Sequence, residues 1–400
     1  MTASSSHEIA DVVVIGGGVI GMSTALALAQ SGVRNVVVLE RFGVGSGGTG
    51  KSSGVVRCHY GVKSLAAMAW RSLPVLRDAQ DLLGESAGFH ETGYLVGVGE
   101  NNLDALAANV EMQQGVGIDV EIIDHDQARE LWPKARLDDF AGFAYEPRAG
   151  YGDGHQTAMA FAGAARALGV RIRQQTCVAS LLVEGERVNG VTLSDGGRIY
   201  APEVVLASGV WSKDLLGPLG VDLAIRAQRA PILLVEPGEE LGTVPVLSDL
   251  VSLQYVRMEG TASLLVGNSD HSDPDWADPD DYMNHADDDE LLSAAAKFEH
   301  RFPGLGSAKV SSTYAGCYDV TPDYNPVISG TPYEGLWVCA GFSGHGYKIS
   351  PAVGRLMADL VLDGKSGDPD IDGEDFRLER FADNQLLLSP HPYVGAGSMR

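Results

Sequence analysis

A glycine-rich turn near the N-terminus has the residue types and spacing of a dinucleotide-binding site. Residues 16–21 (GGGVIG) fit the pattern G-x-G-x-x-G. Gly16 permits a tight turn, Gly18 lets the backbone approach a pyrophosphate, and Gly21 lets a helix pack closely on the preceding strand. Glu40, nineteen residues after Gly21, can accept hydrogen bonds from ribose hydroxyls and disfavours the 2′-phosphate of NADP. The start of the helix would offer N–H groups and a favourable dipole to the phosphates.

A second glycine-rich segment, residues 341–348, favours FAD over NAD. It follows an apolar run at 337–340 and precedes a helical pattern at 352–362. Its small residues can bring backbone N–H groups and a helix N-terminus against the pyrimidine end of a flavin, where reduced flavin carries negative charge. From composition alone, an ordinary strand-to-helix turn with a surface lysine is an alternative.

Alternating strands and helices predict an α/β fold that positions these turns. Residues 12–15 and 36–39 are short β-branched runs, typical of buried parallel strands, and an alanine- and leucine-rich helix is expected at 22–30 between them. Further strands are expected at 94–98, 170–173, 178–183, 188–193, 203–207 and within 251–266, and further helices at 65–83, 103–114 and 158–168. Asp153 and its neighbours are expected to cap the helix that begins near Thr157, rather than to bind a metal.

Composition and charge exclude several classes of function. The chain has 29 basic and 53 acidic residues, a net charge of −24, so neither nucleic acid nor an anionic membrane surface is an expected partner. Four scattered cysteines lack metal-ligand spacing. Without a signal peptide or a membrane-length apolar run, a cytoplasmic protein is expected. The acidic segment 271–290 could hold a cation, but it lacks EF-hand spacing and is interpreted as a solvated surface excursion.

Five segments resemble, in the same order along the chain, the D-amino-acid oxidase superfamily of flavoenzymes. They are the N-terminal fingerprint with Glu40-Arg41, residues 49–60, residues 204–209, Thr321-Pro322-Asp323, and residues 341–348. The sequence is most similar to the sarcosine oxidase branch, which includes monomeric enzymes and the β subunit of heterotetrameric ones. The resemblance spans roughly residues 10–380 and rests most specifically on residues 341–351.

The resemblance implies a discontinuous Rossmann-like FAD-binding domain and a substrate domain built on a mixed or antiparallel sheet. The flavin ring would lie between them. The expected FAD-binding pieces are 10–90, 145–220 and 325–380, the substrate domain comprises 91–144 and 221–324, and 384–400 is a peripheral C-terminal tail.

The resemblance also implies oxidation of a carboxylate-bearing secondary or tertiary amine, such as an N-alkyl or cyclic amino acid. The neutral amine would transfer a hydride to flavin N5, and the imine would then hydrolyse. This chemistry depends on placement and desolvation more than on an acid–base residue. Oxygen would be reduced to hydrogen peroxide in an oxidase. The alternatives are a dehydrogenase with another electron acceptor, and a non-catalytic flavin subunit of a multi-subunit complex.

Site residues carry over from the family position by position. Arg57 occupies the carboxylate-binding arginine position and Lys348 the lysine that shares this role, which suits a fork of N–H groups beside a point charge; a solvated surface pair is the alternative. Tyr318 matches an active-site tyrosine, while His59 and Tyr60 are expected near the flavin without assigned roles. The residues expected to bind FAD are Gly16, Gly18, Val19, Ile20, Gly21, Glu40, Arg41, Thr49, Ser52, Ser53, Val178, Ser208, Gly209, Trp211, Gly341, Phe342, Gly344, His345, Gly346, Tyr347 and Lys348. No metal site is expected.

Three positions depart from the family pattern. Gly316 stands where monomeric sarcosine oxidases carry the cysteine that attaches the flavin, and Cys317 is one residue away, on the opposite face of a strand, so non-covalent FAD is expected. Leu265 replaces a lysine associated with oxygen activation, which keeps a dehydrogenase open. Ser269 replaces a substrate-pocket histidine, although His271 is near.

Overall fold

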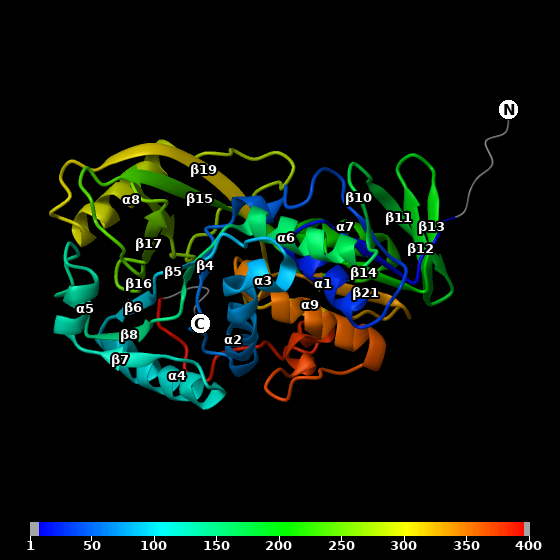
Figure 1. Cartoon of the computed structure of the whole chain (residues 1–400), viewed down its shortest axis with the longest axis horizontal. Helices are drawn as coiled ribbons and strands as arrows, with labels where there is room; N and C mark the ends of the chain where they lie inside the picture. The colour runs from blue at the N-terminus through cyan, green and yellow to red at the C-terminus, as the bar shows by residue number, and fades with distance from the viewer. Residues whose placement is uncertain (1–7, 396–400) are drawn as a thin grey trace.

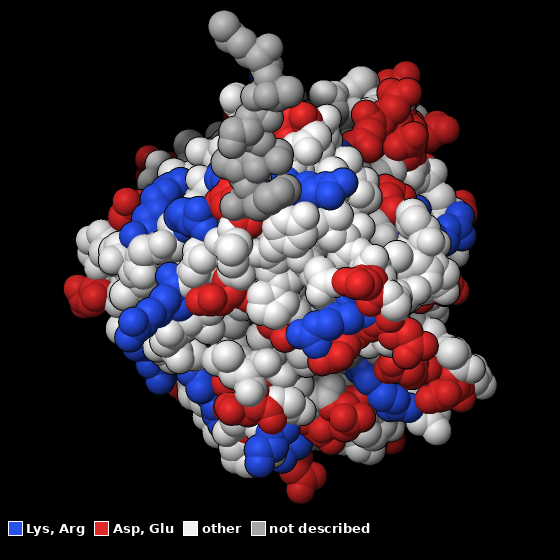
Figure 2. All heavy atoms as spheres, turned by 90° about the vertical axis from the view of Figure 1, so that its right-hand side faces the viewer, with Lys and Arg blue, Asp and Glu red and all other residues white. Residues whose placement is uncertain are grey.

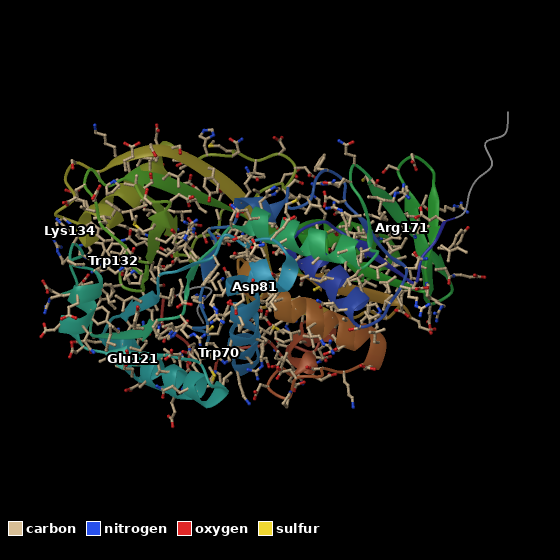
Figure 3. All side chains as sticks on the ribbon, viewed as in Figure 1. Trp70, Asp81, Glu121, Trp132, Lys134 and Arg171 are labelled. Atoms are coloured by element: carbon tan, nitrogen blue, oxygen red, sulfur yellow. The ribbon has the colours of Figure 1, made fainter. Side chains whose placement is uncertain are left out.

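Two large sheets define the two halves of the molecule. The computed structural model describes residues 8–395. One sheet has six strands and the other has eight, and the two lie in different halves of the molecule (Figure 1). Among the side chains labelled in Figure 3, Arg171 lies at the end of the first half, where it pairs with Glu8, and Trp132 lies in the second, where its indole N–H donates to the Pro245 carbonyl at 3.0 Å.

The six-stranded sheet has the order β10-β3-β2-β14-β21-β20. Its first five strands run parallel and β20 runs antiparallel. The strands are β2 (Val12–Ile15), β3 (Val36–Leu39), β10 (Arg171–Arg173), β14 (Glu203–Leu206), β20 (Val327–Gly330) and β21 (Leu336–Ala340). The predicted Rossmann-like arrangement of an α/β fold is therefore confirmed.

Both faces of this sheet are buried, which explains its continuous apolar strands. Val12 and Val14 belong to the core cluster that contains helix α1 (Val19–Gln30). Val13 belongs instead to a second cluster, shared with the small sheet β1-β13-β12-β11. That sheet consists of β1 (Glu8–Ile9), β11 (Val178–Glu184), β12 (Arg187–Leu193) and β13 (Arg198–Tyr200). Alternate residues of each strand thus face different layers.

Three helices cover the side of the six-stranded sheet that carries α1. Helix α1 packs against α6 (Gly154–Ala167) and α9 (Gly346–Asp363), and α9 also packs against α2 (Lys63–Arg77). The Asp153 side chain accepts from the Gln156 N–H at 2.8 Å, which confirms the predicted N-cap. The helix expected at 65–83 is divided, because Asp78 leaves helical geometry and α3 (Ala79–Leu83) follows it.

The eight-stranded sheet is mixed, as predicted for the substrate domain. Its order is β19-β15-β18-β17-β16-β6-β8-β7, and β16 pairs with β6 in parallel while the other pairs are antiparallel. The strands are β6 (Tyr94–Val98), β7 (Glu121–Ile123), β8 (Gly142–Glu146), β15 (Arg226–Glu236), β16 (Val246–Asp249), β17 (Gln254–Glu259), β18 (Ser263–Asn268) and β19 (Lys309–Val320). The predicted domain boundaries stay a prediction, because the sheet topology shows which strands share a sheet but not where one domain ends and the next begins.

Short elements complete the chain between the two sheets. The strands β4 (Val55–Val56), β9 (Gly150–Tyr151) and β5 (His90–Glu91) form a three-stranded sheet. The remaining helices and 3-10 turns are η1 (Gly48–Lys51), η2 (Glu100–Asn102), α4 (Leu103–Val116), α5 (His125–Leu131), η3 (Gly209–Trp211), α7 (Ser212–Leu216), η4 (Gly217–Leu219), α8 (Asp288–Arg301), η5 (Gly373–Phe376) and η6 (Leu378–Arg380). Strand β4 leads directly into Arg57 and so places that side chain between the two halves.

The C-terminal stretch expected as a peripheral tail is packed into the molecule over its described part. Leu387 donates its backbone N–H to Asp323 at 2.9 Å, and the Tyr393 side chain is only 2% exposed. Asp323 also pairs with the buried Arg380. Polar side chains of the body hold this stretch by its backbone, so it needs no regular secondary structure of its own.

Acidic and basic side chains are interspersed on the face shown in Figure 2. No helix among residues 8–395 has the length and apolar character needed to cross a membrane. Within the same residues, no group of three His, Cys, Asp or Glu side chains is arranged to hold a metal ion.

Candidate active site

The first glycine turn is packed so tightly that only glycine fits at two positions. Gly16 has φ +113°, and a Cβ there would lie 2.4 Å from the Ala207 carbonyl oxygen. A Cβ at Gly21 would lie 2.0 Å from the Gly16 carbonyl oxygen. Helix α1 begins at Val19, directly after the turn, so its first N–H groups point out of the carboxyl edge of the sheet. This cradle fits the pyrophosphate of a dinucleotide.

Glu40 and Thr49 hold the turn in place. One Glu40 carboxylate oxygen accepts from the Gly17 N–H and the other from the Phe42 N–H, both at 2.7 Å. The Thr49 hydroxyl accepts from the Val19 N–H at 3.0 Å. The contact of Glu40 with a ribose stays a prediction, and the structure shows that Glu40 ties the end of β3 to the turn.

Arg41 and Trp211 meet at the same edge of the sheet. The Arg41 guanidinium lies over the Trp211 ring at 4.1 Å, and both side chains bond to Asp280, at 2.8 and 3.0 Å. Asp280 belongs to the acidic segment 271–290, which therefore bridges to the nucleotide-binding half although most of it is exposed. Ser208 and Gly209 follow β14 at this edge, and Val178 begins β11.

The second glycine segment forms a compact turn that is held by a buried carboxylate. The Gly341 N–H donates to the Asp319 carboxylate at 2.7 Å. A Cβ at Gly344 would lie 3.1 Å from the Tyr318 ring. Helix α9 begins at Gly346, six residues before its predicted start, so Lys348 lies in its first turn. The turn therefore brings Lys348 to a cavity that residues of the eight-stranded sheet also line.

A small cavity of about 80 Å³ lies between this turn and the eight-stranded sheet. Its lining comes from both halves of the molecule and consists of Ser53, Val55, Arg57, Tyr94, Ser248, Tyr255, Asn268, Ser269, His271, Tyr318, Ser343, Gly344, His345 and Lys348. Arg57 and Lys348 are each 6% exposed, so they are not a solvated surface pair. Burial and the neighbouring Arg57 hold the pKa of Lys348 well below its usual range. Two basic groups in one buried cavity indicate an anionic ligand.

Arg57 is held from behind by its own chain neighbours. It donates from Nη1 to the His59 carbonyl and lies over the Tyr60 ring at 4.4 Å. Tyr60 in turn contacts His345, with its hydroxyl 3.3 Å from Nδ1. These contacts place His59 and Tyr60, predicted near the flavin, in the wall that supports Arg57.

A buried carboxylate, Glu146 at the end of β8, was not predicted. Its Oε2 accepts from the Cys58 N–H at 2.8 Å, and its Oε1 lies 3.9 Å from His59 Nδ1. Burial raises the pKa of Glu146 to about 7, whereas burial and Arg57 lower the pKa of His59 to about 3. The sequence gives no sign that this glutamate, at the end of an apolar strand, is buried beside Arg57 and His59.

Two tyrosines and a histidine also line the cavity. Tyr318 on β19 and Tyr255 on β17 are within hydrogen-bonding reach of each other, and Tyr255 raises the pKa of Tyr318 well above its usual range. The His271 ring lies 6.5 Å from the Tyr318 ring. Sequence reasoning identified Tyr318 but missed Tyr255, because a single tyrosine in an alternating strand is ordinarily a packing residue.

The geometry offers no cysteine at the position of covalent attachment. A Cβ at Gly316 would lie 2.6 Å from the Lys51 Cβ, so the Lys51 side chain covers that position. Cys317 is partly buried, and burial raises its pKa to about 11, which keeps the thiol protonated and unreactive.

Two glycine turns lie at one edge of the six-stranded sheet, and a cavity with two basic side chains lies beside them. This arrangement suits a flavoenzyme, and comparison with known protein families leads to the same conclusion. A family model described as FAD dependent oxidoreductase (DAO) matches residues 11–360. The chain belongs to this family. It is therefore an FAD-dependent oxidoreductase, and the resemblance inferred from the five sequence segments is confirmed.

Individual relatives extend this result. The chain is 29% identical to the sarcosine oxidase subunit beta of Arthrobacter sp over 395 residues, which cover 94% of this chain and 92% of that one. It is 29% identical to 4-methylaminobutanoate oxidase (formaldehyde-forming) of Paenarthrobacter nicotinovorans over 93% of this chain, but spans only 46% of that relative. The solved structure of L-proline dehydrogenase from P. horikoshii matches with a TM-score of 0.87 and 26% identity, covering 95% of this chain and 100% of that one.

Proposed function

We propose that this enzyme oxidises a secondary or tertiary amine that carries a carboxylate, such as an N-alkyl or cyclic amino acid, with non-covalent FAD as its cofactor. The observation that carries the proposal is the burial of Arg57 and Lys348 in one cavity beside the two glycine turns. The names of the relatives support it, since they act on sarcosine, 4-methylaminobutanoate or L-proline.

The residues of the chain divide the work of binding and orientation. Gly16, Gly18 and the start of α1 would hold the pyrophosphate, and the start of α9 would face the pyrimidine end of the ring. Bound FAD supplies the two-electron oxidant that converts the amine into an imine, which water then hydrolyses. Arg57 would bind the substrate carboxylate through two parallel N–H groups. Lys348, whose pKa is lowered by burial and by Arg57, would take up a proton beside the bound carboxylate and so add a second positive charge.

The rest of the cavity excludes water and fixes the orientation of the amine. The hydroxyls of Tyr255 and Tyr318, which line the same cavity, would give the amine end polar partners. Because the imidazoles of His59 and His345 are buried and their pKa values are lowered below the ordinary value, both are neutral and add no competing positive charge. Placement and desolvation in a closed site can then supply most of the rate enhancement.

An anaerobic substrate screen tests the proposal. The purified, FAD-loaded protein is mixed without oxygen with N-methyl amino acids, cyclic imino acids and D-amino acids, and bleaching of the visible flavin band is recorded. We expect bleaching by at least one carboxylate-bearing secondary or tertiary amine, and little by the same amine without its carboxylate. Equal bleaching by both compounds, or none by any amine, would contradict the proposal.

A dehydrogenase that passes electrons to another acceptor is a second candidate. The observation that favours it is Leu265, an apolar side chain only 1% exposed on β18, where the family's oxygen-activating lysine would stand. Slow reoxidation of substrate-reduced protein in air is expected for this candidate, and fast reoxidation would exclude it.

We also propose that the chain works within a multi-subunit complex, because it is similar to a beta subunit. We propose a cytoplasmic location because its four cysteines are free.

Carboxylate binding should weaken as pH rises through about 7, because Glu146, whose pKa is raised to about 7 by burial, then gains a negative charge close to Arg57. Below this pH the carboxyl is neutral and leaves Arg57 free to bind an anion. We expect the Kd of acetate, measured by perturbation of the flavin spectrum, to rise on the order of tenfold between pH 6 and 8. Glu146→Gln, which stays neutral, should keep the affinity of pH 6 throughout. The same pH step in both proteins would assign the effect to another group, such as Lys348.

A further inference from the structure

We infer that Tyr393, in the C-terminal segment 387–394, is a positioning residue that fixes Arg57 through His59. The inference rests on the proposed function, because it concerns the carboxylate-binding side of the same cavity. It assigns a role to a stretch that carries no motif and forms no helix or strand in its described part.

Tyr393 is fully inserted behind the cavity wall. Its hydroxyl lies 2.8 Å from His59 Nε2, and the two rings stack with centroids 5.9 Å apart at 17°. The carbonyl of His59 accepts the hydrogen bond from Arg57. Tyr393 and Arg57 therefore hold the same residue from opposite ends, one through its ring and the other through its backbone.

The Tyr393 contact does not depend on which imidazole nitrogen carries the proton. A neutral imidazole has one donor and one acceptor nitrogen, and burial lowers the pKa of His59 to about 3. A tyrosine hydroxyl can donate or accept, so it can bond to Nε2 in either tautomer. Glu146 Oε1 lies 3.9 Å from Nδ1, which is beyond hydrogen-bond distance.

Asparagine and aspartate side chains bring the segment to this place by holding its backbone. Asn325 donates to the Leu387 carbonyl at 2.7 Å, and Asn109 donates to the His391 carbonyl at 3.0 Å. Asn102 makes two bonds with the backbone of Val394, at 2.8 and 3.2 Å. Asn109, which holds the residue two before Tyr393, lies in α4, and Asn102 lies in η2 directly before that helix. Figure 1 shows the C-terminal segment running beside α4.

The consequence is that the C-terminal segment sets the pose of a residue far from it in sequence. Within this buried wall, water cannot replace a lost Tyr393 hydroxyl at Nε2 without rearrangement. The imidazole would then turn, and the backbone of residues 58–60 that receives Arg57 would lose its fixed position. An arginine fork that is displaced by a few tenths of an ångström no longer pairs both N–H groups with a carboxylate.

Tyr393→Phe, which removes only the hydroxyl, tests the inference in the FAD-loaded protein. We expect the Kd of acetate, read from the flavin spectrum, to rise about three- to tenfold, while flavin content and the limiting rate of anaerobic reduction stay unchanged. In an Arg57→Ala background, Tyr393→Phe should have no further effect, because the two residues act through one contact. Tyr333→Phe is the matched control, since that hydroxyl donates to the Leu219 carbonyl at 2.9 Å and neither residue lines the cavity.

Each result decides the question. An unchanged Kd in Tyr393→Phe, an equal rise in Tyr333→Phe, or the same rise with and without Arg57 would overturn the positioning role. If Tyr393→Phe does not fold, Asn102→Ala provides the test, because it releases Val394 but keeps the hydroxyl, and it should weaken acetate binding in the same direction. If acetate leaves the spectrum of the unmodified protein unchanged, the proposed function fails, and this inference fails with it.

Discussion

Replacing Arg57 with alanine is expected to raise the KM for a carboxylate-bearing amine by about 100- to 1000-fold, because the substrate loses a charge-assisted, two-point contact in a buried cavity. Arg57 is 6% exposed, so water cannot substitute for it at low cost. Lys348 remains as a point charge without the matching fork. The change is measured by anaerobic reduction of the flavin over a range of substrate concentrations, which separates affinity from the limiting rate.

Two comparisons make the result specific. Arg57→Lys should recover only part of the affinity, since an ammonium cannot pair with both carboxylate oxygens in the same geometry. An amine without a carboxylate should reduce the flavin of Arg57→Ala as slowly as it reduces the flavin of the unmodified protein. A KM that stays within about twofold in Arg57→Ala, too small a change for the loss of such a contact, would show that the carboxylate binds elsewhere.

The nucleotide half was predictable because its signals are local. Strands β2 and β3 have the predicted bounds, since runs of β-branched residues buried on both faces leave little ambiguity. The glycine fingerprint identifies its own turn, because Gly16 and Gly21 satisfy steric requirements of residues only a few positions away. Helix α9 was predicted six residues short, because glycine, serine and proline near its start have low helix propensity and tertiary packing decides the boundary.

The substrate side was predictable only by resemblance. Arg57 and Lys348 meet because β4 and the first turn of α9 converge on one cavity, and no spacing in the sequence encodes that meeting. Glu146 and Tyr393 were missed for the same reason, since each is a single residue whose burial depends on distant partners. The acidic segment was correctly placed at the surface, but the contacts of Asp280 with Arg41 and Trp211 depend on the fold.

Gly21→Ala is expected to yield protein with less than about a tenth of the normal flavin content, because the added methyl group strikes backbone that cannot yield. The new Cβ would lie 2.0 Å from the Gly16 carbonyl oxygen and 3.4 Å from the Ala207 Cβ. To remove this clash, α1 must move away from β2. The movement displaces the first N–H groups of α1, which would otherwise face the pyrophosphate. Overpacking of this kind typically lowers the free energy of unfolding by about 1–3 kcal/mol, so the protein should fold but bind FAD weakly.

Gly115→Ala separates loss of the cradle from a general effect of replacing glycine with alanine. Gly115 lies in α4, and a Cβ there would have no atom within 4 Å. This variant should keep its flavin and gain up to about 1 kcal/mol of stability from improved helix propensity. Both proteins are compared by the ratio of visible flavin absorbance to protein absorbance and by their melting temperatures with and without added FAD. Full flavin content in Gly21→Ala would mean that the turn at Gly16 does not hold the dinucleotide, whereas flavin lost from that variant alone would place the pyrophosphate at the start of α1.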